Sequence, residues 1–379
     1  MEHGNHHSGH NGGQSRRSFL AASGVALGST VLVAGCLGNG EDDGASEVTA
    51  AAGGAELRQE AVSWDELGDL SGELTIYSDR KRGQIDPLFE TLEATYDDLE
   101  IVREYGDNML GQLKVERSST PADIYYTQSS GELAALKSEG LAAKLPGDIV
   151  EAIDENYSDP DGHWTGASGR VRAVLYNSDV FSADELPDDI FEYAEDERFA
   201  GRISTRPNSG TFRSFIVAMI ELEGEKRTRE WVRKMVNDQD ITLYSGGSQQ
   251  AEAVHNGEQD IALGNQYYAG RIIGTNPDSP LSVTFTNDDP GCLFNVSGLA
   301  ITAGVDDEAL AADFIRHTLG AEGQEFFVET NGEYPVVDEV PYVGELPTAD
   351  EINPPSFDLN ALEDVDHAQD LLREEGMTV

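Results

Sequence analysis

Short strand-like and helix-like runs alternate along the chain from about residue 74, and this alternation limits the folds that it can adopt. Residues 74–77 are typical of a strand, and large apolar side chains then recur at helical spacing between Ile85 and Tyr96. Strands separated by helices predict a mostly parallel sheet with helices on both faces, so the expected fold class is α/β. In this first half we expect further strands at 99–104 and 122–127 and helices around 109–116 and 131–138.

A second series of the same kind begins after residue 170. The chain from Glu73 to its last residue has roughly 300 residues, which is more than one hydrophobic core usually holds, so two lobes are expected. Ligands of such sheets bind beyond the carboxyl ends of the strands. We expect strands at 171–176, 201–204, 242–244 and 260–263 and helices at 211–222 and 248–256.

The first 35 residues predict an export signal rather than a domain. An arginine pair at 16–17 precedes an apolar stretch at 21–34, which is typical of a twin-arginine signal, and small residues then precede Cys36 as in a lipoprotein cleavage site. An uncleaved membrane anchor is the alternative, but the stretch is shorter than the roughly 20 residues that span a bilayer. We therefore expect residues 1–35 to be a twin-arginine lipoprotein signal and residues 36–72 to be a lipidated cysteine and a flexible linker.

The chain is strongly acidic along its whole length. It has 71 Asp and Glu against 25 Lys and Arg, a formal net charge of −46, and the acidic residues are spread through every segment. Molar salt shortens the range of charge repulsion to roughly 3 Å, which makes such a composition tolerable. We therefore expect a halophilic protein that loses structure when salt is removed. The same charge argues against nucleic acid as a partner, because phosphate contacts require a basic face.

The sequence carries no pattern typical of a catalytic site. It lacks the nucleophile elbow, the zinc-protease helix and the phosphate-binding loop, and the histidines after the linker are isolated from one another. If Cys36 carries lipid, Cys292 is the remaining cysteine, and we expect a small buried residue there in preference to a reactive thiol. A protein that is not an enzyme is therefore expected.

Two adjacent tyrosines follow the strand expected at 260–263. Tyr267 and Tyr268 come shortly after Asn265, in a loop of the kind where α/β proteins place ligand-binding residues. A phenolate is a hard anionic oxygen ligand, the kind of ligand that ferric iron prefers. The alternative is an aromatic pair that packs on a neighbouring element. The pair therefore raises the hypothesis of an iron site.

Two glycine-containing loops precede expected helices and offer backbone N–H groups to an anion. They are residues 209–211, with the sequence Ser-Gly-Thr, and residues 246–248, with the sequence Gly-Gly-Ser. Arg80 follows the first strand and is expected to pair with such an anion through both terminal nitrogens. The alternatives are that the glycines serve only the turns and that Arg80 and Arg170 pair with some of the many carboxylates.

Seven short motifs occur in order along the body of the chain. They are Leu74-Thr-Ile-Tyr-Ser78, Pro121-Ala-Asp-Ile124, Ser168-Gly-Arg170, Asn208-Ser-Gly210, Asn265-Gln-Tyr-Tyr268, Asp289-Pro-Gly291 and Glu333-Tyr-Pro335. Together they resemble the ferric-iron-binding proteins of ABC importers, which are extracellular solute-binding proteins with a two-lobed type II periplasmic-binding-protein fold. The resemblance implies that each lobe is a mixed sheet flanked by helices and that two hinge crossovers join the lobes. It implies a first lobe of residues 73–172 plus 299–345 and a second lobe of residues 173–298 plus 346–379, with crossovers at about 170–175 and 295–300.

The resemblance also implies roles for individual residues. Tyr267 and Tyr268 stand where the family has its paired iron-binding tyrosines. Many bacterial members add a His and a Glu, but this chain has Lys81 and Gln128 there, and where other members add a third tyrosine it has Ser209. Iron would then depend on a bound anion, carbonate or phosphate, for its remaining ligands. The expected anion-binding residues are Arg80, Ser209, Gly210, Thr211, Gly247, Ser248 and Asn265, and the other expected cleft residues are Asp79, Gln128 and Arg170.

The function implied is that of an extracellular lipoprotein, anchored to the outer face of the cytoplasmic membrane through Cys36. It would capture ferric iron with a synergistic anion and deliver it to an ABC permease and its ATPase, and a monomer is expected. The alternative is a protein of the same fold that captures a non-metal anion, such as a phosphate-, phosphonate- or carboxylate-type solute. A purely structural surface lipoprotein is a more distant alternative.

Overall fold

A computed structural model of the chain describes residues 62–378, except residues 107, 338–341, 343 and 345. The expected export signal, Cys36 and most of the expected linker lie outside the described residues. In the part of the chain that is described, no helix combines the length and the apolar character that a membrane crossing needs.

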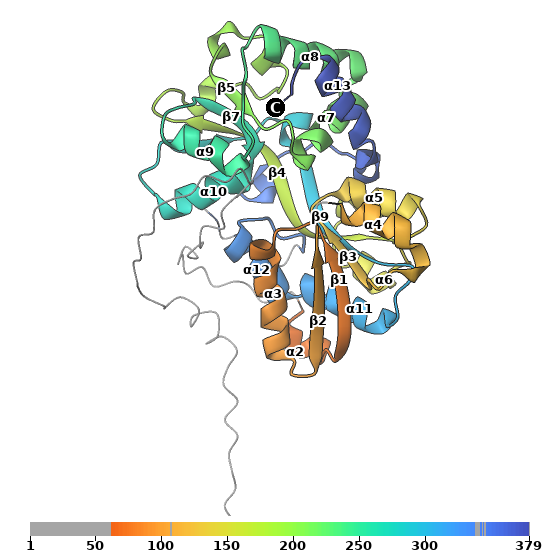
Figure 1. Ribbon diagram of the computed structural model, residues 1–379. Helices are drawn as coiled ribbons and strands as arrows, with labels where there is room; N and C mark the ends of the chain where they lie inside the picture. Colours follow the sequence, from red (N-terminus) through yellow and green to blue (C-terminus); the bar gives the residue numbers. More distant parts are fainter. Residues whose placement is uncertain (1–61, 107, 338–341, 343, 345, 379) are drawn as a thin grey trace, which may run out of the picture. The chain divides into compact units, whose positions relative to one another are not determined.

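Eight strands form one path of hydrogen-bonded neighbours in the order β2-β1-β3-β9-β4-β7-β5-β6, and β8, the ninth strand, pairs with β4 beside this path (Figure 1). All seven strands that the sequence predicts are present, with ends shifted by at most two residues, except that β4 begins six residues before the predicted start. The strands are β1 (Gly72–Ser78), β2 (Leu99–Tyr105), β3 (Ile124–Thr127), β4 (Thr165–Asn177), β5 (Ile203–Thr205), β6 (Thr242–Leu243), β7 (Ile261–Asn265), β8 (Leu281–Thr284) and β9 (Phe294–Ile301).

The first lobe is built around β1, which pairs in parallel with β2 on one side and β3 on the other. Its longest helix illustrates why the sequence folds in this way, because Ile85, Leu88, Phe89 and Leu92 recur at helical spacing and all four are buried. The expected helices are confirmed here. The helices of this lobe are α2 (Trp64–Leu67), α3 (Arg82–Thr95), α4 (Met109–Glu116), α5 (Ser130–Ser138), α6 (Gly147–Val150), α11 (Glu308–Leu319) and α12 (Ala321–Phe326).

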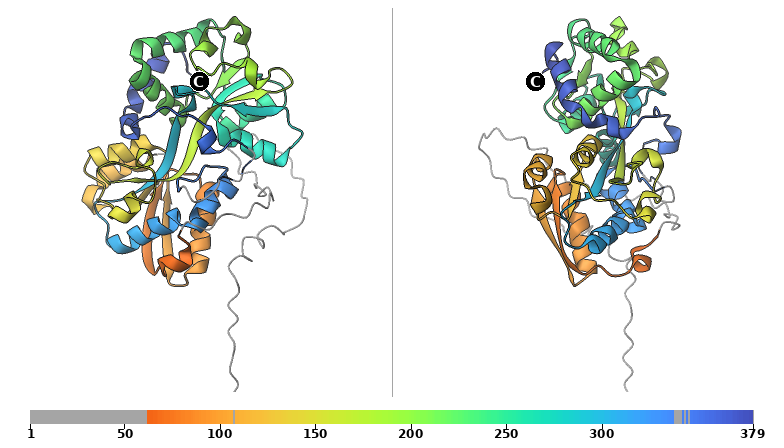
Figure 2. Two further views of the ribbon diagram at one scale, coloured as in Figure 1. Left: turned by 180° about the vertical axis from the view of Figure 1, so that it is seen from behind. Right: turned by 90° about the vertical axis from the view of Figure 1, so that its right-hand side faces the viewer.

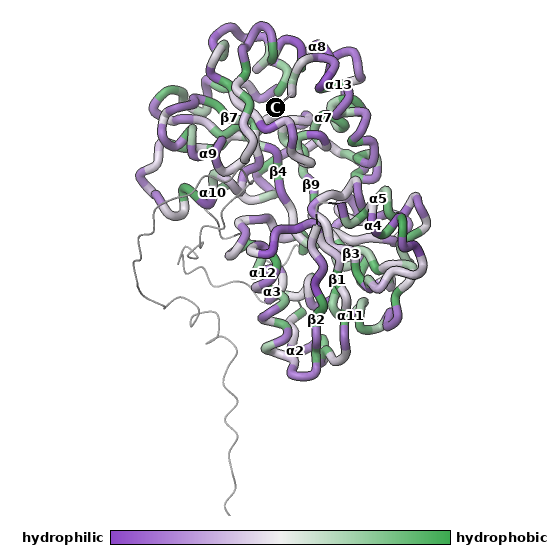
Figure 3. The backbone as a smooth tube through the Cα atoms, viewed as in Figure 1, coloured by the Kyte–Doolittle hydropathy of each residue, from purple (hydrophilic) through white to green (hydrophobic). Residues whose placement is uncertain are grey.

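The second lobe contains β5, which pairs in parallel with β6 and β7, while β4 runs antiparallel to β7 and β8. Hydrophobic and hydrophilic residues alternate along its helices, as expected for helices with one face on a core (Figure 3). In the second helix after β5, for example, Trp231, Val232 and Met235 are buried. The helices are α7 (Gly210–Glu223), α8 (Glu225–Asn237), α9 (Gly247–His255), α10 (Gln266–Thr275) and α13 (Val365–Glu374).

Two long strands connect the lobes. Residues 165–171 of β4 pair with β9, whereas residues 172–177 of the same strand pair with β7 and β8. The crossovers expected at 170–175 and 295–300 therefore lie within β4 and β9. Arg172, which the expected boundary assigns to the first lobe, pairs with Asn265 of β7 and so belongs with the second lobe. Figure 2 shows these two strands, in yellow-green and cyan, running through the middle of the described residues. A site on the face of β4 is consequently adjacent to both lobes.

The last segment of the chain contacts elements of both lobes. Helix α13 packs against α7 and α8, while the short helix η9 (Leu359–Glu363) packs against α5. The approach of η9 is close, because a Cβ atom at Gly131 would lie 2.2 Å from the carbonyl oxygen of Leu362. The side chain of Asn360 also accepts a hydrogen bond of 3.1 Å from the indole of Trp164. The C-terminal residues thus contact both lobes and connect them.

Cys292 is buried, as the sequence predicts. Its sulfur donates to the carbonyl oxygens of Asp289 and Asn353, at 3.4 and 3.3 Å. Burial raises the pKa of the thiol, which lowers the thiolate fraction at neutral pH. The residue therefore serves packing at the edge of the hinge.

Candidate functional site

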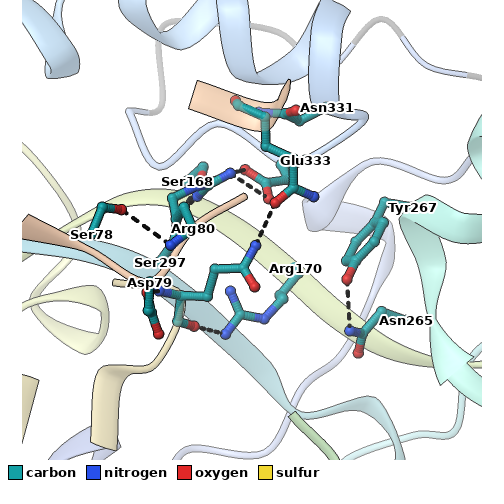
Figure 4. Close-up of polar contacts among 12 residues, drawn as sticks. Ser78, Asp79, Arg80, Ser168, Arg170, Asn265, Tyr267, Ser297, Asn331 and Glu333 are labelled. Carbon is teal, nitrogen blue, oxygen red and sulfur yellow. Dashed lines mark hydrogen bonds and ion pairs between the residues drawn. The ribbon is translucent and has the colours of Figure 1, made fainter. Parts of the chain in front are cut away.

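The two tyrosines lie in the first turn of a helix and not in the loop that the sequence predicts. The backbone of Asn265 is still extended, and α10 begins directly at Gln266, so no loop separates the strand from the helix. The rings of Tyr267 and Tyr268 pack together, with centroids 4.3 Å apart. Tyr267 is buried and its hydroxyl accepts a hydrogen bond of 3.4 Å from Asn265 (Figure 4), whereas Tyr268 is half-buried. A strand end and a helix start thus fix both phenols.

Gly247 holds the second tyrosine in place. It is the first residue of α9, and a Cβ atom there would lie 2.4 Å from Cζ of Tyr268 and 2.7 Å from its hydroxyl oxygen. Such distances are shorter than any real Cβ contact, so only glycine allows the ring to lie where it does. The sequence predicts an anion contact at Gly247, and the structure adds a steric role next to the phenol.

A cavity of about 10 Å³ lies between these helix starts in the second lobe. Thr211 is central to it, because its hydroxyl accepts a hydrogen bond of 3.3 Å from Asn265 and is 3.3 Å from the hydroxyl of Ser209. Four of the expected anion-binding residues line the cavity, while Gly210 and Ser248 lie at the same helix starts beside it. The lining residues are Arg172, Arg206, Ser209, Thr211, Gly247, Gln250, Leu263, Gly264, Asn265 and Tyr268.

Arg80 has a partner that the sequence does not predict. Its guanidinium is buried and donates from Nη2 to both carboxylate oxygens of Glu333, at 3.0 Å each, and from Nη1 to the hydroxyls of Ser297 and Ser168 (Figure 4). Burial opposes the ionisation of Glu333, but the charge of Arg80 and the hydroxyl of Ser168 outweigh it and lower its pKa. Arg80 therefore pairs with a protein carboxylate, which is the alternative that the sequence leaves open, and the anion contact expected for it stays a prediction.

Glu333 reaches Arg80 because of an irregular turn before it. Residues 327–331 form a π-helical turn, and Gly332 then adopts the left-handed conformation, with φ of 65°. The last residue of that turn, Asn331, donates to the carbonyl oxygen of Gln84 at 3.0 Å and accepts from Arg271 of α10 at 3.2 Å. The segment that presents the carboxylate is therefore held by both lobes.

Asp79 and Gln128 contact each other at the strand ends of the first lobe. The carboxylate of Asp79 accepts from the backbone N–H of Gln128 and from the hydroxyl of Thr127, both at 2.9 Å. Burial and the nearby carboxylate of Glu132 raise the pKa of Asp79 to about 7. Lys81, at the start of α3, is exposed. Asp79 therefore organises the loop of its own lobe.

Arg170 lies on β4 between this loop and the tyrosines. Its Nη2 donates to the carbonyl oxygen of Gln128, and burial lowers its pKa. Its Nε has no hydrogen-bond partner among the described residues. Arg170 therefore adds positive charge to the face of β4 that lies beside both lobes.

The described residues contain no group of three or more His, Cys, Asp and Glu side chains that could hold a metal ion. The arrangement places Tyr268 at the wall of a cavity lined by hydroxyl, amide and guanidinium donors, and Tyr267 against Asn265 of the same wall.

Comparison with known proteins decides the family. Residues 119–358, well over half of the chain, match the profile of the bacterial extracellular solute-binding proteins. The chain belongs to this family. The Fe(3+)-binding periplasmic protein of Serratia marcescens is 30% identical to this solute-binding protein over 240 residues, which cover 62% of this chain and 70% of that protein. Iron uptake protein A1 of Synechocystis is 27% identical over 288 residues, which cover 73% of this chain and 79% of that protein.

Solved structures give the same result for the fold. The iron-bound HitA of Pseudomonas aeruginosa superposes with a TM-score of 0.74 at 26% sequence identity, over 80% of this chain and 99% of HitA. The two-lobed type II fold expected from the sequence motifs is thereby confirmed for this solute-binding protein.

Glu333 and Arg172 are among the residues of the site that the sequence prediction lacks. Glu333 is part of a motif that carries the family resemblance. It lies 253 positions from Arg80 in the sequence, so no local pattern indicates that the two residues pair. Arg172 follows Arg170 by two positions in β4, and this spacing places both side chains on one face. Strand alternation is therefore the signal that could have identified Arg172.

Proposed function

We propose that this solute-binding protein captures ferric iron together with an oxyanion and delivers it to an ABC permease and its ATPase. The observation that carries the proposal is the position of Tyr267 and Tyr268 beside a cavity lined by Ser209, Thr211 and Asn265. Relatives that cover most of this chain are named as ferric-iron-binding or iron uptake proteins, which supports the same cargo.

The chemistry of the phenols fits this cargo. Ferric iron is a hard, highly charged ion that prefers anionic oxygen ligands, and its field favours the phenolate over the phenol. Two phenolates leave part of the metal charge and most of its coordination positions unfilled. A carbonate or phosphate ion in the adjacent cavity would supply both charge and oxygen atoms. Metal binding should therefore release protons and weaken in acid.

The location and partners belong to the same proposal. The arginine pair at 16–17 and the small residues before Cys36 support twin-arginine export and lipidation, so that the protein is held at the outer face of the membrane. In this arrangement it acts as a monomer, catalyses no reaction and passes iron to the permease. A Cys36→Ala variant should be exported but recovered from the medium, whereas recovery in the membrane fraction would contradict the lipid anchor.

The visible spectrum of the protein with ferric iron tests the cargo. Full-length protein in multimolar NaCl should develop a coloured tyrosinate-to-iron band on addition of ferric iron with phosphate or bicarbonate. A Tyr267→Phe, Tyr268→Phe double variant should lack the band, while the control Tyr244→Phe, which alters a half-buried tyrosine after β6, should retain it. A colourless wild-type protein that still binds phosphate would instead favour a carrier of a non-metal anion.

A further inference from the structure

Arg172 is the buried cation of the cavity beside the tyrosines. It lies on β4 opposite Asn265 of β7, and paired residues on neighbouring strands present their side chains to the same face. Its side chain is nine-tenths buried, with 7% of the residue exposed, and it lines the cavity together with Thr211 and Tyr268. A formal charge is therefore placed next to the groups that are expected to hold an anion.

The guanidinium of Arg172 has few partners of its own. Its Nη2 donates to the carbonyl oxygen of Leu263 at 3.1 Å, and its charge lies over the rings of Phe212 and Phe215, at 5.4 and 4.9 Å. Among the described residues no carboxylate forms an ion pair with it. Five N–H groups and a full positive charge are thus met by one carbonyl oxygen and two aromatic faces.

The lining of the cavity is unusual for this chain. The chain has 71 acidic residues against 25 basic ones, yet none of the described residues around the cavity is acidic and two of them are arginines. Arg80 shows the opposite arrangement, because its guanidinium is neutralised by Glu333. A buried charge without a counter-charge is unfavourable unless a ligand supplies one.

The size of the cavity limits what can enter it. A volume of about 10 Å³ accommodates roughly one water-sized group, so it has room for one oxygen atom of a larger anion. Thr211 and Asn265 offer a hydroxyl and an amide at its wall. The remaining oxygens of the anion would stay outside the cavity, on the side of Tyr268.

We propose that Arg172, and not Arg80, supplies the counter-charge for the oxyanion. One oxygen of phosphate or carbonate is bound in the cavity by Arg172 with Thr211 and Asn265, and the other oxygens remain available to the metal. This assignment rests on the proposed function for the role of the anion. It further implies that the second lobe binds the anion before iron arrives, because every group involved belongs to that lobe.

Calorimetric titration of full-length, iron-free protein tests the assignment directly. Inorganic phosphate and, separately, bicarbonate are titrated in multimolar NaCl, so that the two sources of oxyanion are distinguished and competition from chloride is constant. Wild-type protein should bind at least one of them. The affinity of Arg172→Gln for the anion should be at least about tenfold lower, which is the loss expected for a charge-assisted hydrogen-bonded contact. Arg172→Lys should lie in between.

The control is Arg202→Gln, which alters another arginine of the same lobe that lies over an aromatic ring, Phe181, but pairs with Asp260 outside the cavity. It should bind phosphate like wild type. Equal affinity in Arg172→Gln and wild type, or no binding of either anion to iron-free wild type, would overturn the proposal. If Arg172→Gln fails to fold, Arg172→Lys carries the test, and unchanged affinity in that folded variant would also overturn it.

The iron spectrum separates this proposal from the proposed function. Anion binding that depends on Arg172 in a protein that gives no tyrosinate band would refute the iron cargo and leave the anion site standing. A tyrosinate band whose requirement for phosphate is the same in Arg172→Gln and wild type would refute the anion site and leave the iron cargo standing.

Discussion

Two buried arginines, one in each lobe, differ in how their charge is balanced. Arg80 in the first lobe pairs through two hydrogen bonds with Glu333 and is further held by Ser168 and Ser297. Arg172 in the second lobe has a carbonyl oxygen and two phenylalanine rings but no carboxylate among the described residues. The first charge is a fixed part of the fold, whereas the second is in a cavity that a ligand can complete. Burial of an arginine alone therefore does not indicate a binding role. What indicates it is whether a carboxylate of the protein already balances the charge.

Removal of one partner of the first pair is expected to have the largest effect on stability. A Glu333→Gln variant leaves Arg80 buried without a counter-charge, which should lower the free energy of unfolding by about 3–5 kcal/mol. By contrast, Arg172→Gln should change it by less than about 1 kcal/mol when no oxyanion is present, because no carboxylate is left unpaired. Denaturant unfolding in multimolar NaCl measures both.

The exposed ion pair of Arg316 and Asp148 provides the control for this comparison. Asp148 is largely exposed, so Asp148→Asn should cost less than about 1 kcal/mol. Similar losses in Glu333→Gln and Asp148→Asn would show that the first arginine does not depend on its carboxylate, and the contrast between the two lobes would fail.

A methyl group at the tyrosine contact should give the next largest effect. In Gly247→Ala the new Cβ atom meets the ring of Tyr268, so the ring or α9 must move, at a cost of about 1–3 kcal/mol in stability. The iron band should weaken or shift as well, because the phenol changes position. Gly147→Ala is the matched control, since it also lies at the start of a helix and its Cβ would meet no atom within 4 Å. An unchanged iron spectrum in Gly247→Ala would contradict the role of Tyr268 as a ligand.

A smaller effect concerns the pH dependence of the first lobe. Burial and Glu132 raise the pKa of Asp79 from 3.8 to about 7, so its protonated form is favoured in the folded state. The stabilisation from this group is then complete below about pH 4 and is lost as the pH rises through about 7. Asp79→Asn, which cannot ionise, should therefore raise stability at pH 8 by about 1–3 kcal/mol more than at pH 5. The difference between the two unfolding curves at the two pH values checks this, and an equal effect at both would contradict it.

The sequence predicts the elements of this fold well because their pattern is local. The buried positions of α3, Ile85, Leu88 and Phe89 among them, can be identified from spacing alone. The sequence predicts a loop around Tyr267, whereas α10 begins at Gln266, because Asn265 ends a strand and caps a helix without a turn between them. Boundaries of this kind depend on the neighbouring strands and not on local propensity.

The candidate site shows where sequence reasoning fails. The residues around Ser209 and Asn265 are brought together as expected, since strand ends of one lobe meet at the same edge. The choice between Arg80 and Arg172 could not be made in this way, because it depends on a carboxylate from a turn near the far end of the chain. Long-range pairing of charges has no periodic signature, and only the folded arrangement shows which arginine is neutralised.

The most direct test of the account is the visible spectrum of wild-type protein titrated with ferric iron in high salt, with and without phosphate or bicarbonate. We expect a tyrosinate-to-iron band that saturates at one iron per chain, requires Tyr267 and Tyr268, and changes in position or strength when the oxyanion is removed. A spectrum that is the same in the Tyr267→Phe, Tyr268→Phe variant, or a wild-type protein that stays colourless with iron, would contradict it.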